Sequence, residues 1–381
     1  MPSARLIHAD SVRDPDLYLA TGISVVDPFT YVETDGKRVI VTTETEADAA
    51  RRNSSATDVW TGSQFGDREL IKNGMNRDEA ALEVVLRTLR KLDVDDVVVP
   101  PAFPLELADY LRGHDVTVRH DRAGYEMRRR VKDERALAGI RSAQKATEAA
   151  FAHVVEMLGA STPAADGLVL DGEPLTAERL TAAIEDVLRA HGCEGEPPLV
   201  GNGPTGANVH ERGSGPIQPH ESVIVDIFPR HTATRFFADM TRTFCFGAAP
   251  EQLRHMHATV YEALRRSTER IAAGVNGKDV WEVACDVIEA GGFRTTRSLA
   301  AGETLDEDFF HGLGHGVGVE VHESPNMGLS GDDLVAGDVV TIEPGVYRKG
   351  FGGIRLEDLA VVREGGCEVL TDFPYTLEVH P

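Results

Sequence analysis

Cysteine is scarce in this chain of 381 residues, and its pattern excludes two classes of site. The four cysteines (Cys193, Cys245, Cys285 and Cys367) lie far apart and form no Cys-x-x-Cys pair. A disulfide framework and a cysteine-ligated zinc site are therefore not expected. We expect all four to be free thiols, buried by default.

Long apolar runs are also missing. No run of 18 apolar residues occurs, so no membrane-spanning helix is expected. The opening sequence, MPSARLIHADSVRDPD, has no apolar signal core, and we expect a cytoplasmic protein. A hydrophobic content of 41% and a charged content of 27% are typical of a soluble globular protein. The length allows two or more domains.

Positive charge is in short supply, and lysine most of all. The chain has 39 lysines and arginines against 62 acids, a net charge of −23, and only seven of the 39 are lysines. Such a surface repels nucleic acid and anionic membranes, so neither is an expected partner. A salt-adapted host or a GC-rich genome would each explain the preference for arginine, and both explanations remain open.

Three common catalytic or cofactor motifs are absent or incomplete. No GxSxG elbow and no HExxH motif occur, so neither a serine hydrolase nor a zincin is expected. Residues 201–206 spell a literal GxGxxG, with Asp226 twenty residues further on. Pro204 removes a backbone donor there, and the sequence that follows cannot form the helix that would hold a pyrophosphate. Nucleotide binding is therefore not expected.

Residues 1–128 are predicted to form a small α/β domain in which short strands alternate with helices. The expected strands cover residues 17–20, 39–43, 97–99 and 116–118, and the expected helices cover 45–52, 77–91 and 104–112. Asn76 and Glu79 are placed to form a capping box at the start of helix 77–91. No nucleophile, metal cluster or phosphate loop is found here, so we expect a gating, regulatory or oligomerising role.

Residues 129–381 are predicted to form a second domain in which a helix pair and a strand pair occur twice. The first set is a long helix from about 128 to 158, a helix at 177–191 and strands at 221–228 and 239–246. The second set is helices at 251–273 and 278–290 and strands at 339–346 and 353–362. A loop rich in glycine, proline and aspartate is expected at 161–174. The repeated order indicates two related halves that face each other, in an α+β fold.

Three histidines and four glycines are concentrated in one stretch, FHGLGHGVGVEVHESP at 310–325. Each glycine inside a helix costs about 0.8–1 kcal/mol relative to alanine, so a regular helix is not expected. A bent strand or loop whose backbone closely approaches another group is favoured. His311, His315 and His322 on such a segment indicate a metal or proton-transfer site. The alternative is a glycine-rich turn with surface histidines.

Four acids lie in apolar, strand-forming runs: Asp226 in VIVDIF, Asp239 before MTRTF, Glu343 in TIEPGVY and Glu357 in RLED. A charged side chain in such a run is costly unless it is compensated. One alone would pair with an arginine, but four acids together with His315 are explained at once by two divalent cations, whose charge balances the carboxylates. This donor set favours Mn²⁺ or Co²⁺, with Zn²⁺ and Fe²⁺ as alternatives.

These residues occur in blocks that resemble, in order, the signature of the pita-bread metallopeptidases, a family that contains methionine aminopeptidase, aminopeptidase P and prolidase. The blocks are GNGPTGANVH (201–210), Asp226 with DMTRTF (239–244), HGLGHGVGVEVHESP (311–325), TIEPGVY (341–347) and GIRLED (353–358). The resemblance covers about residues 129–381 and extends more weakly to residues 1–128, which look like a creatinase-type α/β domain. The implied fold is a duplicated pita-bread catalytic domain that follows this smaller domain.

The resemblance also implies roles for single residues. Five match the ligands of a dinuclear metal centre, with Asp239 and Glu357 as the bridging pair: Asp226, Asp239, His315, Glu343 and Glu357. His210 and His322 match histidines that bind substrate and stabilise the tetrahedral intermediate, and Glu343 matches a proton relay. His311 and Arg355 match positions that help to form the substrate pocket in proline-specific members.

The activity implied by the resemblance is hydrolysis of an N-terminal Xaa-Pro bond in dipeptides or short peptides, by a metal-activated hydroxide. A homodimer is also expected. The short N-terminal domain favours the dipeptidase-like branch over aminopeptidase P. Two alternatives remain open: a binding module that keeps the fold without catalysis, and a creatinase-like amidinohydrolase, which needs no metal.

The hairpin between the two aspartates departs from the family pattern. The spacing from Asp226 to Asp239 is longer than usual by about two residues, and Phe228 stands where glycine is usual. Pro229, Arg230 and His231 follow it. We therefore expect an altered hairpin tip, which affects the shape of the pocket and leaves the ligands in place.

Overall fold

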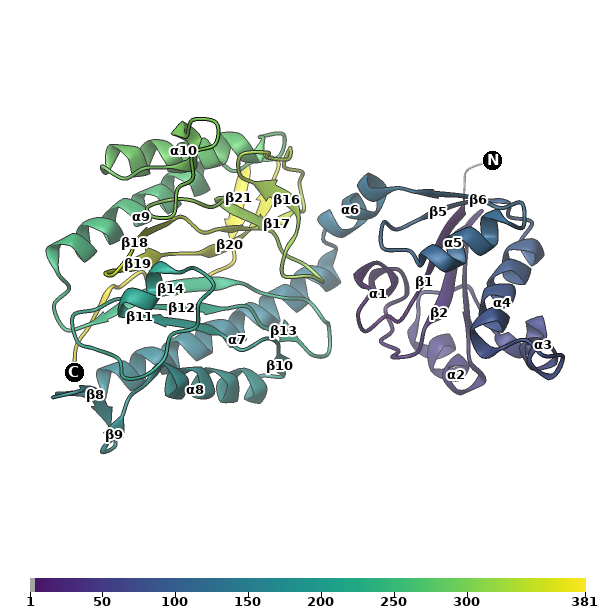
Figure 1. Cartoon of the computed structure of the whole chain (residues 1–381), viewed down its shortest axis with the longest axis horizontal. Coiled ribbons are helices and arrows are strands. Elements are labelled where there is room, and N and C mark those ends of the chain that lie inside the picture. Colours follow the sequence, from purple (N-terminus) through teal and green to yellow (C-terminus); the bar gives the residue numbers. More distant parts are fainter. Residues whose placement is uncertain (1–3) are drawn as a thin grey trace. The chain divides into compact units, whose positions relative to one another are not determined.

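The computed structural model describes residues 4–381, and the chain divides into two compact units, Met1–Arg129 and Arg130–Pro381 (Figure 1). The first unit is built on a mixed sheet with the strand order β4-β3-β2-β1-β5-β6. Its strands are β1 (Ala4–Ala9), β2 (Phe29–Thr34), β3 (Lys37–Thr42), β4 (Asp58–Thr61), β5 (Asp96–Val99) and β6 (Thr117–His120). Its helices are α1 (Pro15–Thr21), α2 (Glu44–Asn53), α3 (Asp67–Lys72), α4 (Arg77–Lys91), α5 (Leu105–Arg112) and α6 (Arg122–Arg130).

Two local predictions for the first unit have opposite outcomes. The capping box is confirmed, because Asn76 Oδ1 accepts from the Glu79 amide at 2.8 Å and Glu79 Oε2 accepts from the Asn76 amide at 3.0 Å. The strand predicted at 17–20 is wrong, because these residues lie in helix α1. Asp14 caps this helix by accepting from the Leu17 amide, and Pro15 occupies its first turn, where a missing N–H costs nothing.

The second unit contains two helix pairs with strands between them (Figure 1). Helices α7 (Glu134–Gly159) and α8 (Ala177–Ala190) pack against β11 (Leu199–Asn202), β12 (Val223–Ile227) and β14 (Met240–Phe246), through a core that includes Phe151, Leu180 and Phe244. Helices α9 (Glu251–Arg270) and α10 (Gly277–Ala290) pack in a second core with β17 (Val339–Ile342) and β20 (Asp358–Arg363). The expected α+β organisation with a duplicated helix and strand order is therefore present. Among the described residues, no helix is both long enough and apolar enough to cross a membrane.

The strands of this unit belong to several sheets. One sheet has the order β11-β12-β14-β22, and another has the order β16-β15-β17-β20-β21. The remaining strands of these sheets are β15 (Gly314–Gly316), β16 (Glu323–Met327), β21 (Gly366–Val369) and β22 (Glu378–Val379). Strands β18 (Gly345–Arg348) and β19 (Gly352–Arg355) form a separate pair. Strands β12 and β14 are antiparallel neighbours, so the predicted hairpin is confirmed.

The two strands predicted at 339–346 and 353–362 are each divided in two. The first is interrupted at Glu343-Pro344 between β17 and β18, and the second at Leu356-Glu357 between β19 and β20. Pro344 has no N–H to donate to a ladder, which favours the first break. Glu343 and Glu357 therefore lie where the chain passes from one sheet to the other.

Two further predictions for this unit need correction. The segment at 161–174 is not a loop, because β7 (Thr162–Ala164), β8 (Gly167–Leu170) and β9 (Glu173–Pro174) form an antiparallel three-stranded sheet. The helix expected from about 128 to 158 is interrupted between α6 and α7. Asp133 caps α7 by accepting from the Ala136 amide at 2.7 Å, which sets the start of that helix.

The glycines of the histidine-rich stretch allow neighbouring strands to approach each other closely. A Cβ atom at Gly314 would lie 2.1 Å from the carbonyl oxygen of Thr341 in β17, and one at Gly316 would lie 2.2 Å from that of Ser324 in β16. Neither distance is tolerable for a real side chain. The close approach predicted from glycine content is therefore an approach between backbones, and it holds His315 in a fixed position between two strands.

Candidate metal centre

A cavity of about 710 Å³ in the second unit brings together every site residue predicted from the sequence. They come from segments up to 147 residues apart in the chain, 210 to 357. The cavity is lined by nine of these residues: His210, Asp226, Asp239, His311, His315, His322, Glu343, Arg355 and Glu357. Sequence position alone could not show that they face one space.

Each candidate ligand lies on a strand or at a strand end. Asp226 is in β12 and Asp239 immediately precedes β14, its antiparallel neighbour. His315 is in the middle of β15, and Glu343 and Glu357 occupy the two breaks described above. Sheet hydrogen bonds on either side hold these positions, so the carboxylates are fixed in place before any ligand binds.

Three of the candidate ligands lie close enough to share one cation. Each of Asp239, His315 and Glu357 offers a ligand atom within 4.8 Å of those of the other two. The Nε2 atom of His315 lies 3.7 Å from Asp239 Oδ2 and 3.4 Å from Glu343 Oε1. Oxygen donors with one imidazole form a set that suits divalent first-row metals.

The tautomer of His315 fits a metal ligand. Its Nδ1 lies 3.0 Å from the carbonyl oxygen of Gly316, which can only accept, so Nδ1 carries the proton and donates. Burial, with a smaller effect of His322, lowers the pKa of His315 to about 4, so the ring is neutral at pH 7. The bare Nε2 lone pair therefore faces the oxygens of Asp239 and Glu343. When these carboxyls are ionised, acceptors face each other here, and a cation between them would satisfy both.

The pKa values of three of the carboxyl groups are raised, because no positive charge fully compensates their burial and mutual repulsion. Burial, together with Glu357, Asp226 and Glu343, raises the pKa of Asp239. Burial, followed by the charges of Glu343 and Asp226, raises the pKa of Glu357. Burial raises the pKa of Glu343 to about 7. Bound cations would lower these pKa values, because their charge offsets both the desolvation of the carboxylates and the repulsion between them.

Asp226 supplies a second sign that the site fits metal. Its Oδ2 accepts from the Arg355 guanidinium at 2.6 Å, whereas its Oδ1 is buried and has no hydrogen-bond partner among the described residues. A buried carboxylate oxygen without a partner costs free energy unless it meets an ion or water. The donor set, the His315 tautomer and this atom together fit a bound divalent metal.

Three further polar residues support the cluster, and the sequence reasoning missed them. Thr241 Oγ1 donates to Glu357 Oε2 at 2.8 Å, and Thr341 Oγ1 accepts from the His315 amide at 3.0 Å and lies 3.3 Å from Glu343 Oε1. Each threonine is two residues from a candidate ligand, so it shares that ligand's face of the strand. This spacing is the signal that could have identified them. The third residue, Tyr347, contacts both Arg355 and His311.

The remaining histidines differ in how they are held. Both ring nitrogens of His311 form hydrogen bonds: Nδ1 donates to Gly312 O at 2.7 Å and Nε2 accepts from the Tyr347 hydroxyl at 3.1 Å. Burial, then Arg355, lowers the pKa of His311 to about 4, so it presents a neutral ring to the cavity. His322 is exposed and packs edge-on against His315, with ring centroids 4.3 Å apart. His210 is exposed at the cavity rim.

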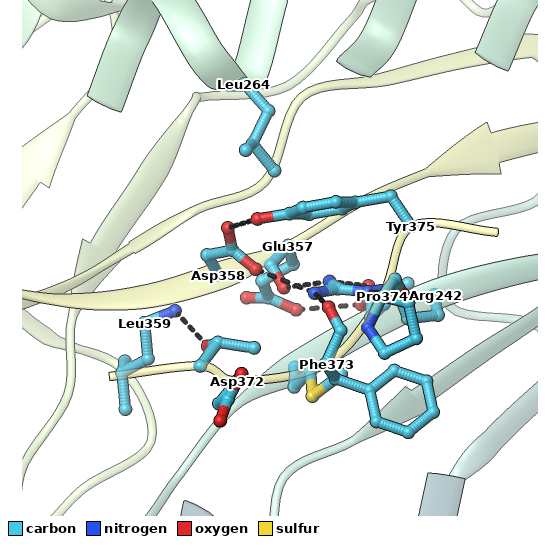
Figure 2. A network of polar contacts seen from close by, with 12 residues as sticks. Arg242, Leu264, Glu357, Asp358, Leu359, Asp372, Phe373, Pro374 and Tyr375 are labelled. Atoms are coloured by element: carbon cyan, nitrogen blue, oxygen red, sulfur yellow. Dashed lines mark hydrogen bonds and ion pairs between the residues drawn. The ribbon is translucent and has the colours of Figure 1, made fainter. Parts of the chain in front are cut away.

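A buried arginine holds the strand that carries Glu357. Arg242 in β14 donates to the main-chain oxygen of Glu357 at 2.7 Å and to Asp358 Oδ1 at 2.9 Å (Figure 2). Tyr375 donates to the other oxygen of Asp358 at 2.5 Å, and its ring lies under the guanidinium. Arg242 and Asp358 each keep only 1% of their side-chain exposure. This network fixes the backbone at the second strand break.

The raised pKa values predict that metal binding weakens in acid. A group whose folded pKa is raised contributes stability below its unfolded pKa and loses it as the pH rises through the folded value. For Glu343 this window runs from about 4.5 to about 7, so metal must displace a proton at pH 5.5 but not at pH 8. We expect Mn²⁺ to bind stripped protein at least about tenfold more weakly at pH 5.5 than at pH 8.

Isothermal titration at the two pH values measures this difference directly. The rise in melting temperature on adding Mn²⁺ should be smaller at pH 5.5. The histidines with lowered pKa values act in the opposite direction on absolute stability, since their contribution is lost as the pH falls from about 6.5 towards 4. The metal-induced difference, rather than the melting temperature itself, is therefore the quantity to compare. Equal affinity at both pH values would contradict the assignment.

The sequence and the fold were compared with known proteins. The model of metallopeptidase family M24 matches residues 138–364. "Probable dipeptidase PepE" of Mycobacterium tuberculosis is 31% identical over 257 residues, which cover 66% of this chain and 61% of the relative. An Xaa-Pro dipeptidase of Lactobacillus helveticus is 32% identical over 189 residues, 48% of this chain and 46% of the relative. The matched region thus spans less than two thirds of the length of these relatives.

Solved structures share the fold over the whole chain. An X-Pro aminopeptidase from Thermotoga maritima MSB8 superposes with a TM-score of 0.81 at 24% identity, and covers 99% of this chain and 97% of its own. Dipeptidase PepE from Mycobacterium ulcerans gives a TM-score of 0.75 at 24% identity, over 100% of this chain and 94% of its own. At these identities the superpositions show the fold, which is the one that the sequence motifs implied. Because the family model covers more than half of its residues, the chain belongs to metallopeptidase family M24.

Proposed function

We propose that the chain is a metal-dependent exopeptidase that hydrolyses the bond between an N-terminal residue and a following proline in short peptides, with two divalent ions held by Asp226, Asp239, His315, Glu343 and Glu357. The observation that carries the proposal is the bare Nε2 of His315 facing carboxylate oxygens at 3.4 and 3.7 Å in a cluster of four acids, two buried and two half-buried. Such ions, when bound, polarise the scissile carbonyl and lower the pKa of water.

The chain's own residues supply orientation and proton transfer. His322 lies beside His315, and burial lowers its pKa, so it is a neutral donor at pH 7 that can hydrogen-bond an oxyanion. Glu343 is placed to accept the proton of the attacking water and return it to the leaving nitrogen. His311 and Arg355 are joined through Tyr347, and this rigid group forms one side of the cavity on which the proline ring can rest. His210 at the rim is placed to bind the substrate.

One assay tests the proposal. Metal-stripped protein reloaded with Mn²⁺ or Co²⁺ is incubated with Xaa-Pro dipeptides, Xaa-Pro-Xaa tripeptides and the corresponding Xaa-Ala peptides. We expect cleavage of the proline peptides that depends on added metal. Hydrolysis of creatine by the metal-stripped protein, or no cleavage of any peptide after metal is added, would count against it, and so would equal cleavage of the Xaa-Ala peptides.

Arg212 at the cavity supports a preference for substrates with a free carboxylate. It is exposed, lines the cavity, and donates to the Pro197 carbonyl at 2.9 Å; no ion pair with a carboxylate is present for it among residues 4–381. The other arginine of the lining, Arg355, is already paired with Asp226. Arg212 is therefore the guanidinium available to the C-terminus of a dipeptide.

Arg212→Ala is expected to raise KM for an Xaa-Pro dipeptide by about tenfold, the lower end for a hydrogen bond to a charged group, with little change in kcat. The C-terminal amide of the same dipeptide should be unaffected, because it carries no charge. Arg189→Ala, which removes an exposed arginine outside this cavity, is the matched control. An equal loss for acid and amide would contradict a role for Arg212 in carboxylate recognition.

A further inference from the structure

Strand geometry places two apolar side chains beside the candidate metal ligand Asp226. Phe228 lies two residues after Asp226, immediately past the end of β12, and its side chain lines the same cavity as that of Asp226. Leu199 in β11 is the direct cross-strand partner of Asp226 and lies on the same face. All three residues line the cavity.

Two more apolar residues contribute to the cavity lining. Val209 and Val321 also line the cavity, each next to a candidate catalytic histidine, His210 and His322. With Leu199 and Phe228 they are, among the described residues and glycines aside, the four apolar side chains in a cavity lining that is otherwise mostly titratable or polar. Apolar side chains next to charged catalytic groups are a feature of subsites that bind substrate side chains.

A second cavity, of about 470 Å³, adjoins Phe228. Its lining comes from the end of α8, from β10 (Cys193–Glu194) and from the hairpin residues Ile227, Phe228 and Pro229. Among the described residues, Phe228 is the one that lines both this cavity and the candidate metal centre. Its side chain therefore contributes to the boundary of both spaces.

The hairpin tip that carries Phe228 is ordered by its own contacts. Strand β13 (Arg230–His231) pairs antiparallel with β10, and Arg230 forms an ion pair of 2.6 Å with Glu194. Ala238 donates to the carbonyl oxygen of Pro229 at 3.1 Å, which closes the hairpin behind Phe228. The hairpin between Asp226 and Asp239 is therefore held by hydrogen bonds and an ion pair, which support the position of Phe228.

We infer that Phe228 sets the size of the subsite that binds the substrate's N-terminal residue. This subsite accepts an apolar side chain of limited size. The inference rests on the proposed function. In that proposal the proline contacts the group formed by His311, Tyr347 and Arg355. The apolar side chains of Leu199 and Phe228 are then left to contact the residue that precedes proline. Removal of the Phe228 ring joins the subsite to the second cavity and admits larger side chains.

The test compares kcat/KM of metal-loaded wild-type protein and Phe228→Ala on Gly-Pro, Ala-Pro, Leu-Pro and Phe-Pro. In the wild type, Leu-Pro should be preferred over Gly-Pro by at least about tenfold, the range for an apolar pocket that gains buried methylenes. Phe228→Ala should raise the ratio of Phe-Pro to Ala-Pro by at least about tenfold. A purely structural loss would lower all four values by one common factor and leave this ratio unchanged.

Phe237→Ala is the matched control. Phe237 lies in the same hairpin tip, is half-buried against Arg230, and lines neither cavity. Its replacement should leave the Phe-Pro to Ala-Pro ratio unchanged. A common factor for all substrates in Phe228→Ala, or an equal ratio change in Phe237→Ala, overturns the inference while cleavage itself still supports the proposed function. Absence of cleavage of every dipeptide by the wild type overturns the proposed function, and the inference with it.

Discussion

Glu357→Gln is expected to lower metal-dependent hydrolysis by at least about 10³-fold. The substitution removes one negative ligand from the cluster of Asp239, His315 and Glu357 and keeps the shape of the side chain. Loss of one metal would forfeit about 4 kcal/mol of transition-state stabilisation, and each tenfold in rate corresponds to about 1.4 kcal/mol. Steady-state kinetics with saturating Mn²⁺ measures the loss.

The fold of this variant should remain intact. Glu357 is a buried acid with a raised pKa, so its charged form destabilises the metal-free protein at neutral pH. We expect metal-free Glu357→Gln to melt at or above the temperature of the metal-free wild type at pH 8. Glu211→Gln, at an exposed acid next to His210, is the control and should keep full activity. Near-normal activity of Glu357→Gln would contradict the assignment of Glu357 as a metal ligand.

Arg242→Leu is expected to destabilise the second unit by about 3–5 kcal/mol, the range for breaking a buried ion pair by removing one partner. It would leave the buried Asp358 with Tyr375 as its remaining side-chain partner in the network (Figure 2). It would also remove donors from several main-chain oxygens, including those of Glu357, Phe373 and Pro374. Chemical denaturation, followed by circular dichroism, measures the difference.

The matched control for this substitution is Arg265→Leu. Arg265 in α9 pairs with Glu262 and Glu269, but all three side chains are exposed, so the pairs are screened by solvent. Little change in the denaturation midpoint is expected there. Similar effects of the two substitutions would show that the Arg242 network does not stabilise the protein.

The candidate site could be predicted because its residues violate local rules. Asp226, Glu343 and Glu357 are acids in apolar, strand-forming runs of the sequence, and such positions usually mark a functional need. The capping box at Asn76 and Glu79 was predictable for the opposite reason, since a purely local pattern determines it.

Other local signals were available but were not used. Asp166-Gly167 and Asp171-Gly172 are Asp-Gly pairs typical of tight hairpins; the second is the turn between β8 and β9, and the first overlaps the turn between β7 and β8. Asp14-Pro15 is a pattern typical of a helix start, and it is a stronger signal for a helix at 17–20 than the apolar run there is for a strand. Pro344 signals the break between β17 and β18.

Contacts between distant segments had no local signal. Lys132 and Glu323 form a fully buried ion pair of 2.6 Å across 191 residues, at 2% and 1% side-chain exposure. The pairing of Arg355 with Asp226 is similarly long-range, and it makes Arg355 a partner of a candidate metal ligand as well as a wall of the cavity. The sequence pattern shows which residues are unusual, and the fold shows which of them face each other.

The most direct test counts the metal ions bound per chain. Stripped protein is titrated with Mn²⁺ at pH 8 by calorimetry, and the dialysed product is assayed by elemental analysis. Two ions per wild-type chain and at most one per Glu357→Gln chain are expected, with hydrolysis of an Xaa-Pro dipeptide returning as the second site fills. No bound ion in the wild type, or the same number in the variant, would contradict a dinuclear centre at these residues.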